Sequence, residues 1–128
     1  MARKKSPTLT EAELRLMRVL WQRGEATVAE VAAAVRSPAP LAYSTVLTML
    51  RILEHKGYLT HTQQGRAFRY RPIVDEKAAR RHAVRHLVSR FFGGSARLLV
   101  LNVIEQEKID VDELQRLRKL VERGGRSR

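Results

Sequence analysis

Polar side chains suited to nucleic-acid contact recur along one segment, residues 43–56, which read YSTVLTMLRILEHK. Helical spacing predicts that its apolar residues share one face and its small hydroxyl residues the other, followed by positive charge. The polar set comprises Ser44, Thr45, Thr48, Arg51 and His55. Threonine can hydrogen-bond base edges or touch a thymine methyl, so we expect Thr45 and Thr48 to contact bases. Tyr43 and Ser44, with the exposed amides of the helix start, and Arg51 further along suit phosphate.

A β-hairpin is predicted directly after this helix. Gly57 is placed to end the helix, and residues 58–62 then alternate as a strand does. The pair Gln64-Gly65 supplies a turn, and residues 67–71 return as a second strand that Pro72 stops. A helix joined to such a hairpin is the layout of a winged helix-turn-helix, in which the helix enters the major groove.

The predicted hairpin carries two arginines that could contact DNA. Arg66 lies at the tip and Arg69 in the second strand, and both suit the phosphate backbone or the minor groove. Phe68 and Tyr70 alternate with Arg69, and we expect them to pack inward rather than stack on bases. The DNA-binding residues expected from the sequence are therefore Tyr43, Ser44, Thr45, Thr48, Arg51, Arg66 and Arg69.

Enzyme chemistry finds little support in the sequence. The acidic residues stand mostly at predicted helix starts, where capping and the helix dipole explain them, and Ser44 has no basic partner at a recognisable spacing. Glycine-rich phosphate loops and metalloprotease motifs are absent. His82 and His86 could place two imidazoles on one metal, but a third ligand is not evident, and we expect a solvated or phosphate-facing role. No catalytic residue, metal, cofactor or small-molecule ligand is therefore predicted.

The charge balance favours a nucleic-acid partner. Lys and Arg number 25 against 13 Asp and Glu, a net charge of +12. Such an excess commonly signals nucleic acid and sometimes a membrane surface, while generic solubility charge is the alternative. The chain has no cysteine, which fits a cytoplasmic protein without disulfides. No apolar run approaches the ~20 residues of a membrane-spanning helix, and the first ten residues lack the apolar core of a signal peptide.

Two short helices are predicted ahead of residues 43–56. Thr10 with Glu13, and Thr27 with Glu30, have the spacing of capping boxes. The first helix carries an apolar stripe formed by Leu14, Met17, Leu20 and Trp21, with Trp21 as a core anchor; Val28, Val31, Ala32 and Val35 form the inward face of the second. Together with residues 43–56, these helices make a tri-helical DNA-binding core.

Three further helices are predicted after Pro72. Asp75 caps the first, which runs to about Phe92; Ser95 caps the second; the last begins at Asp110 and ends at Gly124-Gly125. Residues 96–107 are apolar nearly all round, so they must be covered on more than one side, and a partner subunit is the natural cover. Packing of these helices against the winged domain is the alternative. The dimerisation residues expected are Leu87, Phe91, Leu98, Leu101, Ile104, Leu114, Leu117 and Val121.

The fold class expected is therefore mainly α with a small β-hairpin, a winged helix-turn-helix followed by a helical dimerisation region. The boundaries predicted are a basic flexible tail over residues 1–8, the winged-helix domain over 9–72, the helical dimerisation domain over 73–123 and a flexible tail over 124–128.

From Leu9 to about Val121 the chain resembles the BlaI/MecI family of bacterial winged-helix repressors. The stretches that carry the resemblance are LTEAELRLMRVLW, LAYSTVLTMLRILEHKGYL, GRAFRYRP and FFGGSARLLVLNVIEQE. The resemblance implies a homodimer that binds a two-fold operator in double-stranded DNA and represses genes for β-lactam resistance or other stress and membrane functions. In the resistance branch of the family, a membrane metalloprotease partner leads to a cut after an Asn followed by an aromatic residue. The matching position here is Asn102-Val103.

The chain departs from the family pattern at two positions. Val103 replaces the aromatic residue at the cleavage position, and Ile52 stands where the family usually has a basic residue. The chain also lacks the C-terminal cysteine motif of the related copper-sensing branch. The function predicted is a sequence-specific dimeric repressor; the alternative is a non-specific architectural protein that coats nucleic acid.

Overall fold

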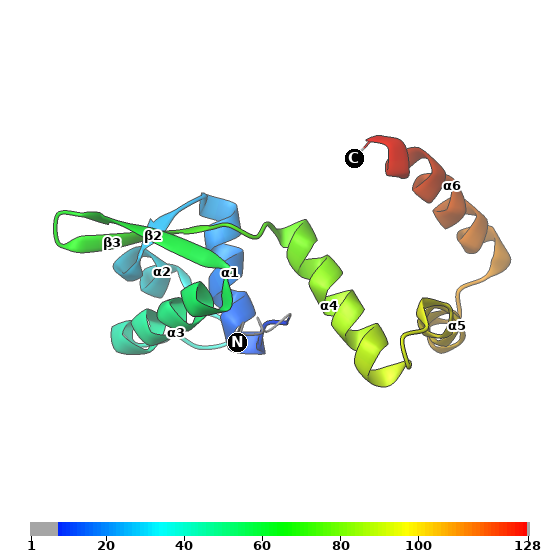
Figure 1. The fold of residues 1–128 in the computed structure, drawn as a ribbon, viewed down its shortest axis with the longest axis horizontal. Coiled ribbons are helices and arrows are strands. Elements are labelled where there is room, and N and C mark those ends of the chain that lie inside the picture. The colour runs from blue at the N-terminus through cyan, green and yellow to red at the C-terminus, as the bar shows by residue number, and fades with distance from the viewer. Residues whose placement is uncertain (1–7, 128) are drawn as a thin grey trace, which may run out of the picture. The chain divides into compact units, whose positions relative to one another are not determined.

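The computed structural model describes residues 8–127, with side chains to Gly124. The chain divides into two compact units that meet between His86 and Leu87, inside one helix, and each unit is described separately below. The first contains three complete helices, a small sheet and most of a fourth helix, and the second contains the rest of that helix and two more. The predicted fold class, mainly α with a β-hairpin, is confirmed (Figure 1). Most of the tail predicted over residues 1–8 lies outside the described residues.

Capping boxes start the first two helices, as predicted. In α1 (Glu11–Arg23), the Glu13 amide donates to Thr10 Oγ1 at 3.1 Å and the Thr10 amide to Glu13 Oε1 at 2.9 Å. In α2 (Val28–Ala34), the corresponding Thr27 and Glu30 bonds are 3.2 and 2.9 Å. Each box satisfies two amides that have no partner inside the helix, so short-range sequence alone fixes both starts.

Helix α3 (Tyr43–Lys56) has the bounds that its sequence predicts. Gly57 follows it with φ of 95°, in the left-handed region that favours glycine, and the amide of Tyr58 donates back to the Leu53 carbonyl at 3.0 Å. This ending turns the chain directly into the hairpin.

The sheet has three antiparallel strands in the order β1-β3-β2. Strands β2 (Leu59–Gln64) and β3 (Ala67–Pro72) form the predicted hairpin, and β1 (Ala26–Thr27), which the sequence did not reveal, pairs with the outer edge of β3. The predicted turn at Gln64-Gly65 is wrong by one residue. Gln64 still pairs with Ala67, and the turn consists of Gly65, at φ of 61°, and Arg66.

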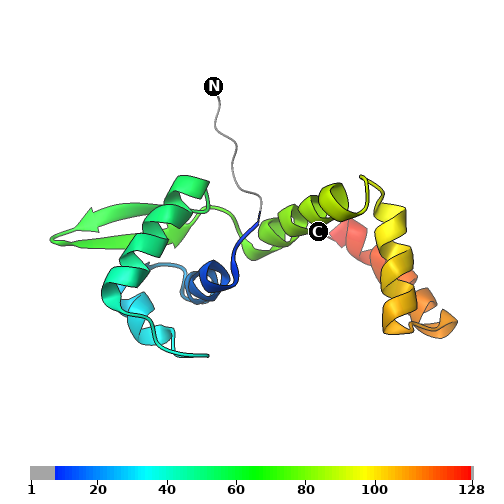
Figure 2. The ribbon, with the colours of Figure 1, turned by 90° about the horizontal axis from the view of Figure 1, so that it is seen from below.

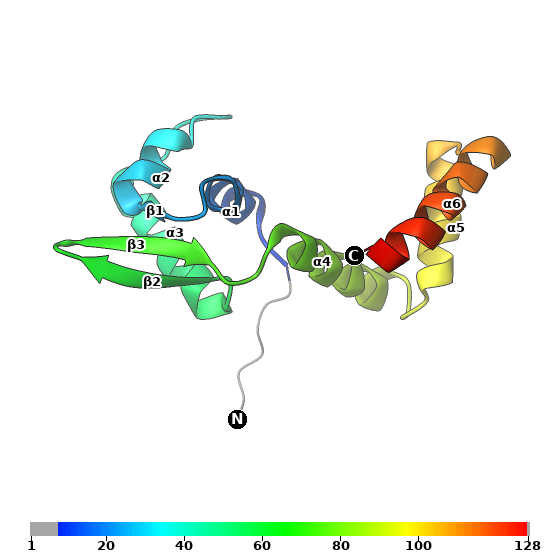
Figure 3. The same cartoon turned by 90° about the horizontal axis from the view of Figure 1, so that it is seen from above.

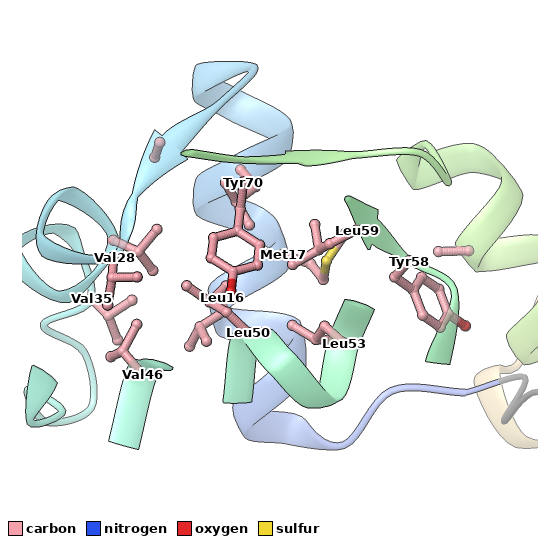
Figure 4. Packing of buried hydrophobic residues seen from close by; sticks show 14 residues of the cluster. Leu16, Met17, Val28, Val35, Val46, Leu50, Leu53, Tyr58, Leu59 and Tyr70 are labelled. Carbon is pink, nitrogen blue, oxygen red and sulfur yellow. The ribbon is translucent and has the colours of Figure 1, made fainter. Parts of the chain in front are cut away.

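The core of the first unit lies between the sheet and the three helices (Figure 4). Leu16, Met17 and Leu20 from α1 are completely buried, as are Val46, Leu50 and Leu53 from α3. Leu14, predicted in the stripe of α1, is only half-buried. Tyr70 reaches from β3 into this core, as expected, and Phe68 packs at its edge. Figures 2 and 3 show α3 lying against one face of the hairpin. Because both elements contribute side chains to the same core, the core fixes the position of α3 relative to the hairpin.

The last three helices begin at the predicted caps. Helices α4 (Glu76–Phe91), α5 (Ala96–Glu107) and α6 (Val111–Ser127) follow Asp75, Ser95 and Asp110, whose side chains accept from backbone amides at 2.8, 3.0 and 2.9 Å. The predicted helix end at Gly124-Gly125 is wrong. Helix α6 continues to Ser127, through most of the tail expected over 124–128, because glycine weakens a helix without forbidding it.

The second unit has no core of its own. Among the described side chains from Leu87 to Gly124, none is buried. Large apolar side chains face solvent instead, from Leu87 at 39% exposure to Phe91 and Val121 at 71%. Within residues 8–127 no single helix is long and apolar enough to cross a membrane; only α4 and α5 taken together, as a bent pair, reach the required length and composition.

Candidate nucleic-acid interface

The outer face of α3 presents the polar side chains that the sequence predicts there. Tyr43, Ser44, Thr45, Thr48 and Arg51 are all exposed, and Tyr43 has 56% of its surface open to solvent. His55 and Ile52 share this face. The opposite face is completely buried, so α3 cannot turn to present other residues without losing its core contacts.

The start of α3 lacks the side-chain cap found on α1 and α2. Ala42 occupies the cap position and makes no side-chain hydrogen bond, and the first turn carries no acidic residue. The first amides of the helix therefore keep their donor capacity and the positive end of the dipole. This is the electrostatic arrangement that suits a phosphate beside Tyr43 and Ser44.

The two hairpin arginines are placed differently. Arg66 lies in the turn and is exposed. Arg69 points to the side of the sheet opposite Tyr70, where its guanidinium lies 3.5 Å from Glu30 and 4.0 Å from Glu25. The Thr27 amide, followed by the nearby charge of Arg69, holds the pKa of Glu30 below its ordinary value of 4.5. Arg69 thus links β3 to the start of α2, while Arg66 is available at the tip.

Side chains also join α3 to the hairpin. The Nδ1 atom of His61 lies 2.8 Å and 3.0 Å from the two carboxylate oxygens of Glu54, and the imidazole packs against Phe68 with ring centroids 4.6 Å apart. Burial raises the pKa of the Tyr70 phenol, as does the charge of Glu54, and the charge of the nearby Arg51 opposes this. Arg51 is therefore both exposed and close to Tyr70 of β3.

Two basic residues hold the ends of α3 to α1. Lys56 Nζ lies 2.7 Å and 2.9 Å from the Glu13 carboxylate oxygens, and the Arg15 guanidinium donates to the Ala39 carbonyl just ahead of α3. Spacing along the chain does not reveal these contacts, or the one between His61 and Glu54, because the side chains meet only after folding. They position the helix without belonging to its exposed face.

The residues expected at a dimer interface lie on the surface of a single copy of the chain. Leu87, Phe91, Leu98, Leu101, Leu117 and Val121 are exposed, whereas Ile104 and Leu114 are half-buried. Asn102 and Val103, the expected cleavage position, are exposed within α5. Both His82 and His86 are half-buried on α4, and in the part of the chain that the structure describes no group of three metal-ligating side chains comes together.

Comparison with known proteins identifies relatives over nearly the whole chain. The sequence model of the family described as penicillinase repressor matches residues 9–123. The chain is 31% identical to the penicillinase repressor of Bacillus licheniformis over 119 residues, which cover 93% of each chain. It is 22% identical over 117 residues to the methicillin resistance regulatory protein MecI of Staphylococcus aureus strain N315, covering 91% of this chain and 95% of that protein.

A solved structure matches the first part of the fold. The solution structure of the DNA-binding domain of the repressor BlaI covers 59% of this chain and 93% of its own length, with a TM-score of 0.52 and 36% identity. A winged helix is therefore the fold of the region that contains α3 and the hairpin.

Proposed function

The chain belongs to the penicillinase-repressor family, also called the BlaI/MecI family, and from that premise we propose that it is a sequence-specific transcriptional repressor that binds a two-fold DNA operator as a homodimer. Residues 9–72 would form the DNA-binding domain and residues 73–123 the dimerisation domain. The protein would act in the cytoplasm, without a cofactor and without enzymatic activity.

One observation carries the DNA-binding part of this proposal. The exposed face of α3 has hydroxyl side chains at its centre, an uncapped start and a basic hairpin tip beside it, on a fold shared with the DNA-binding domain of BlaI. Thr45 and Thr48 would read base edges, while Tyr43, Ser44, Arg51 and Arg66 would contact phosphate. Arg69 would act through its ion pair with Glu30, by holding the hairpin in position.

Exposed apolar side chains support the dimeric part. The second unit leaves Leu101 half exposed and Phe91 still more so, although these are side chains that proteins normally bury. A second copy of the chain would cover them and bring two copies of α3 to two half-sites about one or two helical turns apart.

The test of the function is selection of genomic DNA fragments by the purified full-length protein at about physiological salt, followed by sequencing. A small set of fragments that share an inverted repeat supports the repressor. Even recovery of all sequences rejects it, and it favours the architectural protein that the net charge of +12 would also permit.

Two substitutions separate base reading from backbone contact. Thr48→Ala should weaken binding to the selected operator more than binding to random DNA, because a base contact is lost. Arg66→Ala should weaken both by a similar factor and lower the dependence of affinity on salt, because a phosphate contact is lost. Equal losses on both DNAs for both variants would contradict this assignment.

Control by proteolysis is a further part of the proposal. A membrane metalloprotease partner would lead to a cut at Asn102-Val103, which removes α6 and part of α5 from the dimer. Both residues lie inside a helix, so cleavage would need local unwinding of α5. Co-expression with a candidate protease and intact-mass measurement under inducing conditions tests this; a chain that stays intact rejects it.

A further inference from the structure

Ile52 is a large aliphatic side chain on the outer face of α3, with 42% of its surface exposed. It lies across the helix from Val46, Leu50 and Leu53, which fill the core, so it adds little to the packing of the fold. A β-branched residue also forms helix less readily than Lys, Arg or Gln would at the same position. Neither core packing nor helix propensity accounts for an isoleucine here.

Two threonines continue the line of Ile52 along the helix. Successive spacings of three and four residues place Thr45, Thr48 and Ile52 in one row, and all three are exposed. Each of these side chains carries a methyl group on its β-carbon. This set of three residues is called the methyl row below.

The cations nearest the methyl row lie at its two sides. Arg51, on one side, lies near enough to Tyr70 for its charge to oppose the raised pKa of that phenol. Lys56, on the other side, is paired with Glu13 at 2.7 Å. The middle of the outer face of α3 therefore presents hydroxyl and methyl groups, and the positive charges lie on either side of them.

We propose that the methyl row reads thymine methyl groups in the major groove, with Ile52 as its principal apolar contact. This inference rests on the repressor function proposed above. Thymine is the base that presents a methyl group in the major groove, beside its O4 acceptor, and the groove is wide enough to admit an α-helix. The threonine hydroxyls can bond base edges while the adjacent methyls and Ile52 exclude water from the thymine methyl.

The length of the row sets how many base pairs it can read. From Thr45 to Ile52 the helix rises about 10 Å, which corresponds to about three base pairs. The thymines that matter should therefore fall within about three neighbouring base pairs of each half-site. Thymines elsewhere in the operator should be insensitive to loss of their methyl groups.

Deoxyuridine provides the test, because it removes the methyl group of thymine and keeps every base-pairing group. Each thymine of the operator found by genomic selection is replaced singly by deoxyuridine, and dissociation constants are measured for the wild type and for Ile52→Ala. Ile73→Ala is the matched control, since Ile73 is 55% exposed in the same unit but lies outside α3.

The wild type and Ile73→Ala should lose about fourfold in affinity at each contacted thymine, the value expected for one buried methyl group. Ile52→Ala should bind the natural operator more weakly and show no further loss with deoxyuridine at the thymine that Ile52 contacts. Ile52→Lys should lose the same sensitivity and gain about one phosphate contact, seen as a salt dependence steeper by about 0.9 in logarithmic slope.

Equal deoxyuridine losses in the wild type and Ile52→Ala, or no loss at any thymine, would overturn the inference and leave the repressor function standing. A genomic selection that yields no shared sequence would overturn the repressor function as well. Circular dichroism of each variant shows whether helix content is kept, so that a folding defect is not mistaken for a lost contact.

Discussion

The two units of this chain differ in how they bury their apolar side chains. The first packs residues from α1, α2, α3, the first turn of α4 and all three strands into one continuous core. The second buries none of its described side chains, although seven of the twelve residues of α5 are apolar. A single copy of the chain buries the apolar core of the first unit. The apolar side chains of the second unit stay exposed, as they would on one half of an interface.

The two units differ in the source of their stability. Burial of apolar area is the main favourable term in folding, so the first unit can hold its shape alone. Isolated helices of the length of α5 are marginal in water, so the second unit depends on whatever covers it. If a second copy provides that cover, the first unit should be indifferent to protein concentration and the second should depend on it.

Leu101→Asp should give the largest effect and tests the comparison directly. A charge placed in an apolar interface without a partner costs several kcal/mol in each copy, enough to lower the dimer affinity by at least about a hundredfold. Sedimentation equilibrium should find a monomer, and hydrogen exchange in α5 and α6 should become fast while α1–α3 stay protected.

The matched control is Gln106→Asp, which adds the same charge to α5 at an exposed polar position. It should remain a dimer. A Leu101→Asp protein that is still dimeric would show that the interface lies elsewhere on the chain.

Leu50→Ala should produce the opposite pattern. Leu50 is completely buried in the core of the first unit, and removing its side chain should destabilise that unit by about 2–5 kcal/mol. Denaturant unfolding measured at two widely separated protein concentrations should give the same loss at both. A loss that shrinks as concentration rises would mean that the first unit also depends on dimerisation.

Lys56→Met should cost less, about 1–3 kcal/mol, because it leaves the Glu13 carboxylate with its capping bond but without its cation. Glu13 has only 8% of its side chain exposed, so water cannot fully replace the ammonium group. Thermal unfolding measures the change. Restoration by Lys56→Arg would identify charge pairing as the cause, and an unchanged midpoint in Lys56→Met would contradict it.

Glu30→Gln should give the smallest effect, visible in the pH dependence of stability. The pKa of Glu30 is lower in the folded chain than in the unfolded chain, so the unfolded chain takes up a proton first as the pH falls below 4.5. The stabilisation that ionised Glu30 gives to the folded state is therefore lost as the pH falls further. Glutamine cannot titrate, so the variant should show a shallower loss of thermal stability between pH 5 and more acidic values. Parallel curves for the two proteins would contradict the assigned contacts.

Local rules predicted much of the fold. Thr10 with Glu13 and Thr27 with Glu30 set helix starts through bonds three residues apart, and Gly57 ends α3 through its own backbone angle, so sequence neighbours contain the information. The buried face of α3 followed from periodicity alone. Strand β1 could not be predicted, because two residues carry no pattern and become a strand only when β3 lies beside them.

The candidate site was predictable only in its outline. Spacing identified the exposed face of α3, but it did not distinguish Arg66 from Arg69, since only folding brings Glu30 and Glu25 to Arg69. The contact from Lys56 to Glu13 joins two helices that lie far apart in the chain. The contact from His61 to Glu54 forms only because the chain reverses between α3 and β2. The position of the turn, at Gly65-Arg66, follows from the register of β2 with β3. The sequence did not specify that register to within one residue.

Trp21 gives the protein a built-in optical probe. It is the single tryptophan of the chain, and its indole N–H donates to the Val74 carbonyl at 2.9 Å, just before α4 begins. The ring also borders a cavity of about 210 Å³ lined by Glu76, Ala79 and Arg80. Any event that shifts the start of α4 against α1 would change the polarity around the indole. Its emission spectrum should therefore report such movement in the unlabelled protein, free of signal from any other tryptophan.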